Sequence, residues 1–177
     1  METYNDKLNK TRNVTLTALF SALLVIVRMF HVPFRMPGLG GVPWLVILLI
    51  TPAFLSSRLS STRISLIGGL IASFLLDTPP GPSHLIKYIS TGLAIDLLHY
   101  ILKNRNTHYI KAIIGASSYA VSFTSLATLF ILIGINMRAL KLGFPYVLVL
   151  HVAFGALAGL ISYLIINIVE KAKFCNL

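Results

Sequence analysis

The stretch "TRNVTLTALFSALLVIVRMF", from Thr11 to Phe30, indicates a membrane protein. A polar, basic flank is followed by an apolar run that starts at Val14 and holds one charged residue, Arg28. A helix needs about 20 mostly apolar residues to cross the hydrocarbon core of a bilayer. Because no small-residue cleavage site ends the run, we expect a membrane helix that is retained rather than a cleaved signal peptide.

The rest of the chain has the same character. Of its 177 residues, 56% are hydrophobic and 11% are charged, which is too apolar for an ordinary soluble domain. The net charge of +10 would suggest nucleic acid as the partner of a soluble protein. Here the basic residues lie between apolar runs, where they set membrane orientation, so we expect no nucleic-acid partner. A lone cysteine, Cys175, excludes an intramolecular disulfide and a Cys-x-x-Cys site.

Six apolar segments follow one another without an intervening soluble domain. They cover residues 13–31, 42–57, 63–77, 84–102, 109–135 and 145–169. The second and third are short and bounded by proline, so they would be tilted or completed by loop residues buried in protein. The sequence thus predicts an all-α integral membrane protein, with residues 1–177 forming one domain of six transmembrane helices.

The distribution of lysine and arginine predicts the orientation of these helices. With the N-terminus inside, ten basic residues lie on the cytoplasmic side: Lys7, Lys10, Arg12, Arg58, Arg63, Lys103, Arg105, Lys111, Lys171 and Lys173. Five lie on the other side: Arg28, Arg35, Lys87, Arg138 and Lys141. The positive-inside rule therefore favours both termini in the cytoplasm, in a multi-pass protein of the cell membrane.

Small residues predict where helices approach one another closely. Ala18 and Ala22 share one face of the first helix, which would pack against a neighbour either inside this protein or outside it. Two further seams would be internal. They comprise Ser118, Ser122 and Ser125 on the fifth helix, and Gly155, Gly159 and Ser162 on the sixth.

Three features together resemble a known family. They are the length with six segments, the stretch "ALFSA" holding Ala18 and Ala22, and the Pro/Gly-rich linker "HVPFRMPGLGGVPW" at residues 31–44. The chain resembles the membrane-embedded substrate-binding subunit, or S component, of energy-coupling factor (ECF) vitamin transporters. The resemblance implies that Ala18 and Ala22 dock on a transmembrane coupling subunit, which joins two cytoplasmic ATPases. It also implies capture of a vitamin-like molecule from outside, followed by toppling in the membrane. The chain holds no Gly-x-x-x-x-Gly-Lys-[Ser/Thr] loop of its own.

The strongest candidates for ligand binding surround the stretch "LLDTPPGPSHLIKY" at residues 75–88. His84, Lys87, Tyr88 and Thr91 share one face at the outer start of the fourth helix. They would bind a ligand, or else anchor the helix at the lipid headgroups. Asp77 would accept a ligand amine or hydroxyl, or else bond free backbone N–H groups at the helix break.

Four more residues are candidates on the outer side. Arg28 would bind a ligand or extend to the headgroups, and Trp44 would stack on a ligand ring or anchor its helix. His151 lies about two turns inside the last helix and would bind a ligand or simply pack. Asn136 is a candidate because the resemblance implies a contribution from the loop before the last helix. Since five outer cations oppose Asp77 alone, an anionic ligand is favoured.

Two other function classes stay open as alternatives. Asp96 and His99 are a polar pair deep in the fourth helix, and would be structural, line the base of a pocket or form part of an intramembrane enzyme.

The sequence has no His-Glu-x-x-His or Gly-x-Ser-x-Gly motif, and its histidines are too far apart to indicate a metal site. It begins Met-Glu, unlike the Met-His start of cobalt and nickel transporters. We therefore expect no enzyme, metal or cofactor. A self-contained carrier would show internal repeats, and none is visible.

Overall fold

The computed structural model describes residues 4–29, 36–55, 57–75, 83–102, 107–134 and 143–174, and the side chains of all of these except 4–7, 83, 84, 173 and 174. Asp77 and Asn136 lie outside the described residues, as does the side chain of His84. The described parts hold six α-helices and one 3-10 helix, and no strand is found among them. The predicted all-α class is therefore confirmed.

Each predicted segment overlaps one α-helix. The helices are α1 (Tyr4–Met29), α2 (Val42–Phe54), α3 (Ser60–Leu75), α4 (Ser83–Ile101), α5 (His108–Leu132) and α7 (Phe144–Phe174), with the 3-10 helix η1 (Leu39–Gly41) before α2. The largest differences from the prediction are at the two ends, where α1 starts before residue 13 and α7 continues past residue 169. In α1 and α7 the apolar run marked only the part of the helix that suits lipid, and the polar flank continues as helix beyond it.

Among the described residues, three helices are long and apolar enough to cross a membrane, namely Leu8–Met29, His108–Leu132 and Phe144–Ala172. Helices α2 and α3 have 13 and 16 residues. At 1.5 Å per residue they reach about 20 and 24 Å, short of the roughly 30 Å hydrocarbon core. Six crossings with both termini inside therefore remain a prediction, and membrane residence is compatible with the three long helices.

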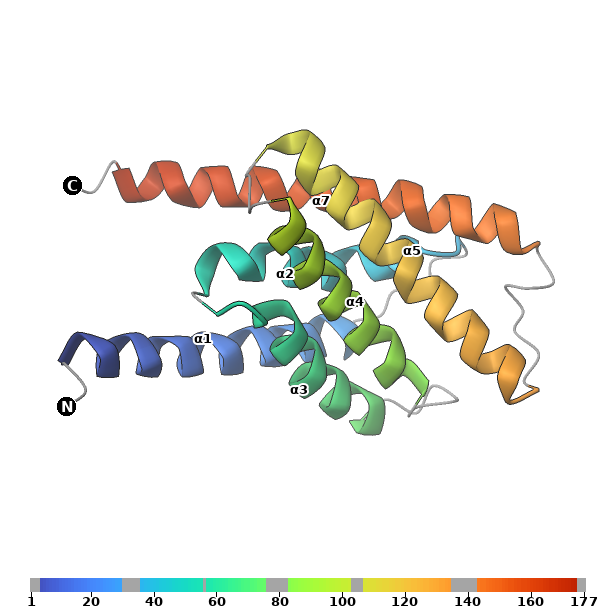
Figure 1. Cartoon of the computed structure of the whole chain (residues 1–177), viewed down its shortest axis with the longest axis horizontal. Coiled ribbons are helices and arrows are strands. Elements are labelled where there is room, and N and C mark those ends of the chain that lie inside the picture. The colour runs from blue at the N-terminus through green and yellow to red at the C-terminus, as the bar shows by residue number, and fades with distance from the viewer. Residues whose placement is uncertain are drawn as a thin grey trace.

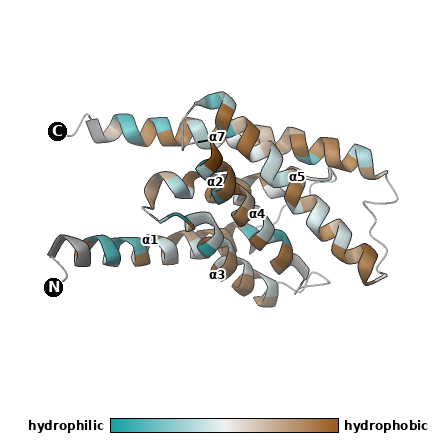
Figure 2. Ribbon diagram, in the orientation of Figure 1, coloured by the Kyte–Doolittle hydropathy of each residue, from teal (hydrophilic) through white to brown (hydrophobic). Residues whose placement is uncertain are grey.

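The two longest helices, α1 and α7, run roughly parallel across the view of Figure 1, and the start of α1 and the end of α7 lie at the same end of the molecule. Helix α2 lies between them, and the main helix–helix contacts are α5 with α7, α3 with α4 and α4 with α5. Hydrophobic residues cover much of α2, α5 and α7, whereas the first coloured turns of α1 are largely hydrophilic (Figure 2).

Helix α2 is the centre of the core. It contacts α1, α3, α4, α5 and α7. A helix that is apolar on all sides is suited to burial on all sides, and "WLVILLI" at residues 44–50 has this pattern. The side chains of Trp44, Leu45, Leu48 and Leu49 are each at most 1% exposed. The shortest of the described α-helices is therefore surrounded by protein.

The predicted glycine seam joins α5 to α7. A Cβ atom on Gly155 would lie 2.8 Å from the Cβ of Tyr119, and one on Gly159 would overlap the carbonyl of Lys111. Gly115 faces Gly155 across the same contact. On the other side of α5, the hydroxyls of Ser125 and Ser90 lie 2.8 Å apart and join α5 to α4. The prediction of close packing at both seams is confirmed.

Asp96 of α4 holds the start of α3. Its carboxylate accepts hydrogen bonds from the backbone N–H groups of Ser61 at 3.2 Å and Thr62 at 2.8 Å, and from the Thr62 hydroxyl at 2.6 Å. The first N–H groups of a helix have no partner within the helix, and a negative charge there is favoured by the helix dipole. Asp96 therefore caps the first turn of α3 from the neighbouring helix α4, and this structural role explains why a carboxylate is buried here.

Candidate ligand-binding site

An aromatic cluster joins four helices. We use this name for Trp44 of α2, Tyr88 of α4, Tyr119 and Phe123 of α5, and Phe144 and His151 of α7. Trp44 meets Tyr88 and Tyr119 edge to face, with ring centroids 5.1 and 5.9 Å apart. The His151 ring lies 4.7 Å from Tyr119 and stacks on Phe123 at 4.6 Å. These distances are those of favourable aromatic pairs, so the cluster is one continuous contact.

The glycine-rich segment before α2 places Trp44 in this cluster. Gly38 has a φ of +90°, which glycine adopts without strain, and its carbonyl accepts a 2.5 Å hydrogen bond from the Tyr119 hydroxyl. A Cβ on Gly41 would overlap that same hydroxyl. Pro43 then fits the first turn of α2, where its missing N–H is not needed. Gly38 and Gly41 therefore let the segment pack directly against the middle of α5.

Lys87 extends over the aromatic rings. Its ammonium nitrogen lies 5.1 Å from the Trp44 ring centroid and 6.0 Å from that of Tyr119. Arg28 is close enough to interact electrostatically with Lys87, Tyr88 and Tyr119. Cation–π contacts contribute on the order of 0.5–2 kcal/mol, less than the cost of a charge in an apolar setting. Two cations thus converge on the cluster, and among the described residues Lys87 has no carboxylate partner.

The cluster also presents hydrogen-bonding groups. The indole N–H of Trp44 is buried and has no hydrogen-bond partner among the described residues. The Nδ1 atom of His151 lies 2.8 Å from the carbonyl of Val147. Since a carbonyl only accepts, Nδ1 carries the proton, and Nε2 of the neutral ring is left as an acceptor. An unpartnered donor, an acceptor and two cations therefore surround the same rings.

The structure brings four of the predicted site residues together. Trp44, Lys87, Tyr88 and His151 are in contact within or directly over the cluster, and Arg28 is close by. Trp44 and Tyr88 are 1% and 2% exposed, so they face the protein interior rather than a lipid belt. Thr91 is different, since its hydroxyl donates to the Lys87 carbonyl one turn earlier at 2.6 Å and so supports the helix.

Two central members of the cluster were missed by the sequence prediction. Tyr119 and Phe123 lie in the middle of α5, inside a long apolar run in which no local pattern sets them apart. The one available signal was a tyrosine among small residues in "GASSYAVS", residues 115–122, which marks a buried face with room for a large ring. The partner of Tyr119, Gly38, is 81 residues away in the chain. Such a contact follows from the fold and not from periodicity.

The cluster lies away from the chain termini. Arg28 is at the end of α1, Trp44 and Lys87 are near the starts of α2 and α4, and His151 is in the first half of α7. The start of α1 and the end of α7 are at the other end of the molecule (Figure 1). The rings are close-packed, with Tyr119 only 1% exposed, so a ligand reaches the space between them only if the rings separate.

The first-helix alanines lie on the outside of the structure. Ala18 and Ala22 are exposed, along with Leu19 at 60% and Leu23 at 40%. The opposite side of α1 is packed inward, where the backbone of Ser21 approaches Gly68 of α3. Ala18 and Ala22 therefore do not pack against another helix of this bundle, which was one of the two alternatives for this face.

No cluster of three or more metal-binding side chains occurs in the part of the chain that the structure describes. Comparison with protein-family models, with curated proteins and with solved structures finds no match to this chain.

Proposed function

We propose that this protein is the substrate-capture subunit of an ECF-type importer. It binds a small, ring-containing anion, such as a carboxylate-bearing vitamin or precursor, at the aromatic cluster. The observation that carries the proposal is the Lys87 ammonium, which lies over Trp44 beside Arg28 and has no carboxylate partner among the described residues. An anionic ligand would neutralise these charges in an apolar setting, where such pairing is strongest.

The chemistry of the rings suggests how the ligand is oriented. Its ring would stack on an aromatic face, its negative group would lie against Lys87 and Arg28, and the Trp44 N–H and His151 Nε2 would take a polar edge. With both termini inside, the cluster would lie nearer the outer leaflet, and a ligand would enter when its rings separate. The outer side is the side from which an importer receives its substrate.

The exposed face of α1 suggests the partner. Ala18 and Ala22 form a small-residue strip on the outside of the bundle, where another helix can approach closely. In the proposed function this strip docks on the transmembrane coupling subunit, and two cytoplasmic ATPases supply the energy that this chain has no P-loop to obtain.

Co-purification tests the proposal. The tagged protein would be isolated in mild detergent from its native membrane, and its partners identified by mass spectrometry. We expect one multi-helix membrane protein and two P-loop ATPases in fixed proportion to the tagged chain. Purification alone, combined with substrate uptake by liposomes that contain only this chain, would instead support a self-contained carrier.

A further inference from the structure

Two hollows lie side by side on the α3–α4 side of the molecule, at the end away from the aromatic cluster. One, which we call the polar hollow, has a volume of about 440 Å³ and a mixed polar and apolar lining that includes Arg12, Arg58, Ser60 and His99. The other, about 690 Å³, is lined mostly by apolar side chains, among them Leu97. Arg58, Asp96 and Tyr100 line both, so the two hollows adjoin.

We propose that the two hollows together bind one anionic phospholipid. The phosphate headgroup would occupy the polar hollow and an acyl chain the apolar one, in the leaflet nearer the chain termini. This inference requires that the protein resides in a membrane but does not depend on the transport function. Basic pockets between membrane helices are known sites for anionic headgroups.

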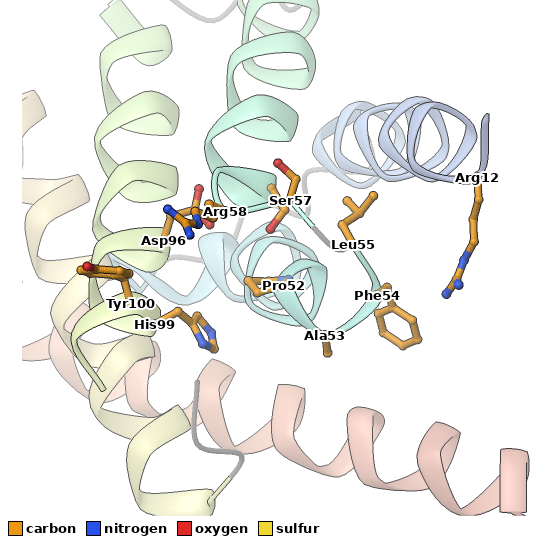
Figure 3. A pocket seen from close by; sticks show the side chains of 11 residues that line it. Arg12, Pro52, Ala53, Phe54, Leu55, Ser57, Arg58, Asp96, His99 and Tyr100 are labelled. Atoms are coloured by element: carbon orange, nitrogen blue, oxygen red, sulfur yellow. The ribbon is translucent and has the colours of Figure 1, made fainter. Parts of the chain in front are cut away.

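The polar hollow matches a phosphate in charge. Arg12 of α1 and Arg58 before α3 both line it, and Asp96, His99 and Tyr100 face it from α4 (Figure 3). Behind His99, the Lys111 ammonium lies 3.3 Å from its Nε2 atom, and the carboxylate of Glu170 interacts with Lys111. The carboxylate of Asp96 is oriented by three hydrogen bonds from the start of α3. Because two arginines line the hollow with this one carboxylate, the formal charge of its lining is positive.

The polar hollow also holds a group suited to a phosphate oxygen. Ser60 is 2% exposed, and its hydroxyl has no hydrogen-bond partner in the described segments. A buried hydroxyl without a partner costs free energy, which a ligand oxygen would recover. Arg58 is exposed and lies at the junction of the two hollows, where the phosphate of a lipid meets its glycerol and chains.

The apolar hollow matches an acyl chain. Leu93, Leu97 and Val121 line it and are 49%, 58% and 40% exposed. An apolar hollow of this kind, next to a hollow lined by arginine, fits a molecule that is anionic at one end and a hydrocarbon at the other. A soluble phosphate compound would use the polar hollow alone.

Native mass spectrometry of the full chain in detergent tests this inference. The protein is titrated with dioleoyl phosphatidylglycerol and, separately, with dioleoyl phosphatidylcholine, and the affinity for the first bound lipid is measured. We expect the anionic lipid to bind more tightly, and Arg58→Gln to weaken it about fivefold, the effect of one basic residue near an anionic surface. Arg63→Gln is the matched control, since Arg63 is exposed on α3 and lines neither hollow.

A second variant tests the chain groove without changing charge. Leu97→Trp fills the apolar hollow and should weaken both lipids, and since Leu97 is 58% exposed the fold should tolerate it. Equal binding of the two lipids by the wild type would overturn the inference. So would equal effects of Arg58→Gln and Arg63→Gln, or full displacement of the lipid by an equal concentration of glycerol 3-phosphate, which has no acyl chain.

Discussion

Lys87 carries the chemical argument at the scale of single residues. Lysine near the start of a membrane helix commonly extends outward to the headgroups. Here its ammonium instead lies 5.1 Å from the Trp44 ring, within an aromatic cluster contributed by four helices. A charge held in such a place is expensive, and on this ground we propose that Lys87 binds a ligand.

Removal of this charge should weaken ligand binding without unfolding the protein. For Lys87→Met we expect a roughly ten- to hundredfold loss of affinity for an anionic ligand, because a hydrogen bond to a charged group is worth about 1.5–3 kcal/mol. Trp44 is the only tryptophan in the chain, so its fluorescence reports the site directly. Lys171→Met, at an exposed position near the end of α7, is the control. Equal affinity in the wild type and Lys87→Met would show that the ligand does not use this charge.

Asp96 should affect stability and not binding. Asp96→Asn replaces an acceptor-only carboxylate by an amide that cannot accept all three hydrogen bonds from Ser61 and Thr62. We expect a loss of about 1–3 kcal/mol, seen as a lower midpoint when helical circular dichroism is followed on heating. Thr62→Val removes only the hydroxyl donor and should cost less. An Asp96→Asn protein that melts like the wild type but has lost ligand binding would contradict the structural role.

Single residues also show the limit of sequence reasoning about the site. Trp44, Lys87, Tyr88 and His151 were predictable, because polar or amphipathic side chains near the outer ends of apolar segments need an explanation. Tyr119 was not, since its partners come from other helices and from a glycine segment far away in the chain. Thr91 shares the Lys87 face but satisfies its own helix, which helical spacing alone does not reveal.

At the scale of elements, the α5–α7 contact depends on glycine. A methyl group on Gly159 would overlap the Lys111 carbonyl, so Gly159→Ala should separate the two helices and destabilise the protein by about 1–3 kcal/mol. Ala153→Val adds volume at an exposed position of the same helix and should be neutral. Thermal unfolding of both variants in the same detergent checks this. Equal midpoints would show that the seam tolerates a side chain.

The exposed face of α1 should affect assembly and not folding. Ala18→Trp or Ala22→Trp places a large ring on a surface that other helices of this protein leave uncovered. We expect normal ligand binding by the isolated chain but loss of the co-purifying coupling subunit. Val149→Trp, at a 65% exposed position of α7, is the control. Unfolding of the isolated Ala18→Trp protein would show instead that this face is internal.

At the scale of the whole molecule, the sequence predicted the helices well because apolar runs bounded by charge, proline and glycine mark helix ends. The number of crossings could not be predicted as firmly. Helix α2 is apolar yet short and enclosed by five other helices, and α4 carries Lys87 and Asp96 inside the bundle. Both helices pack against other helices of the chain. Their hydropathy alone therefore does not show whether they span the bilayer.

The central claim is that this chain captures a small anionic ligand at the aromatic cluster. Native mass spectrometry of the wild type and Lys87→Met, purified side by side from the native membrane, tests it most directly. Our proposal predicts a retained small molecule on the wild type that is released intact on activation, carries a negative group, and is reduced or absent on Lys87→Met. No small-molecule adduct on either protein, or the same adduct at the same occupancy on both, would contradict it.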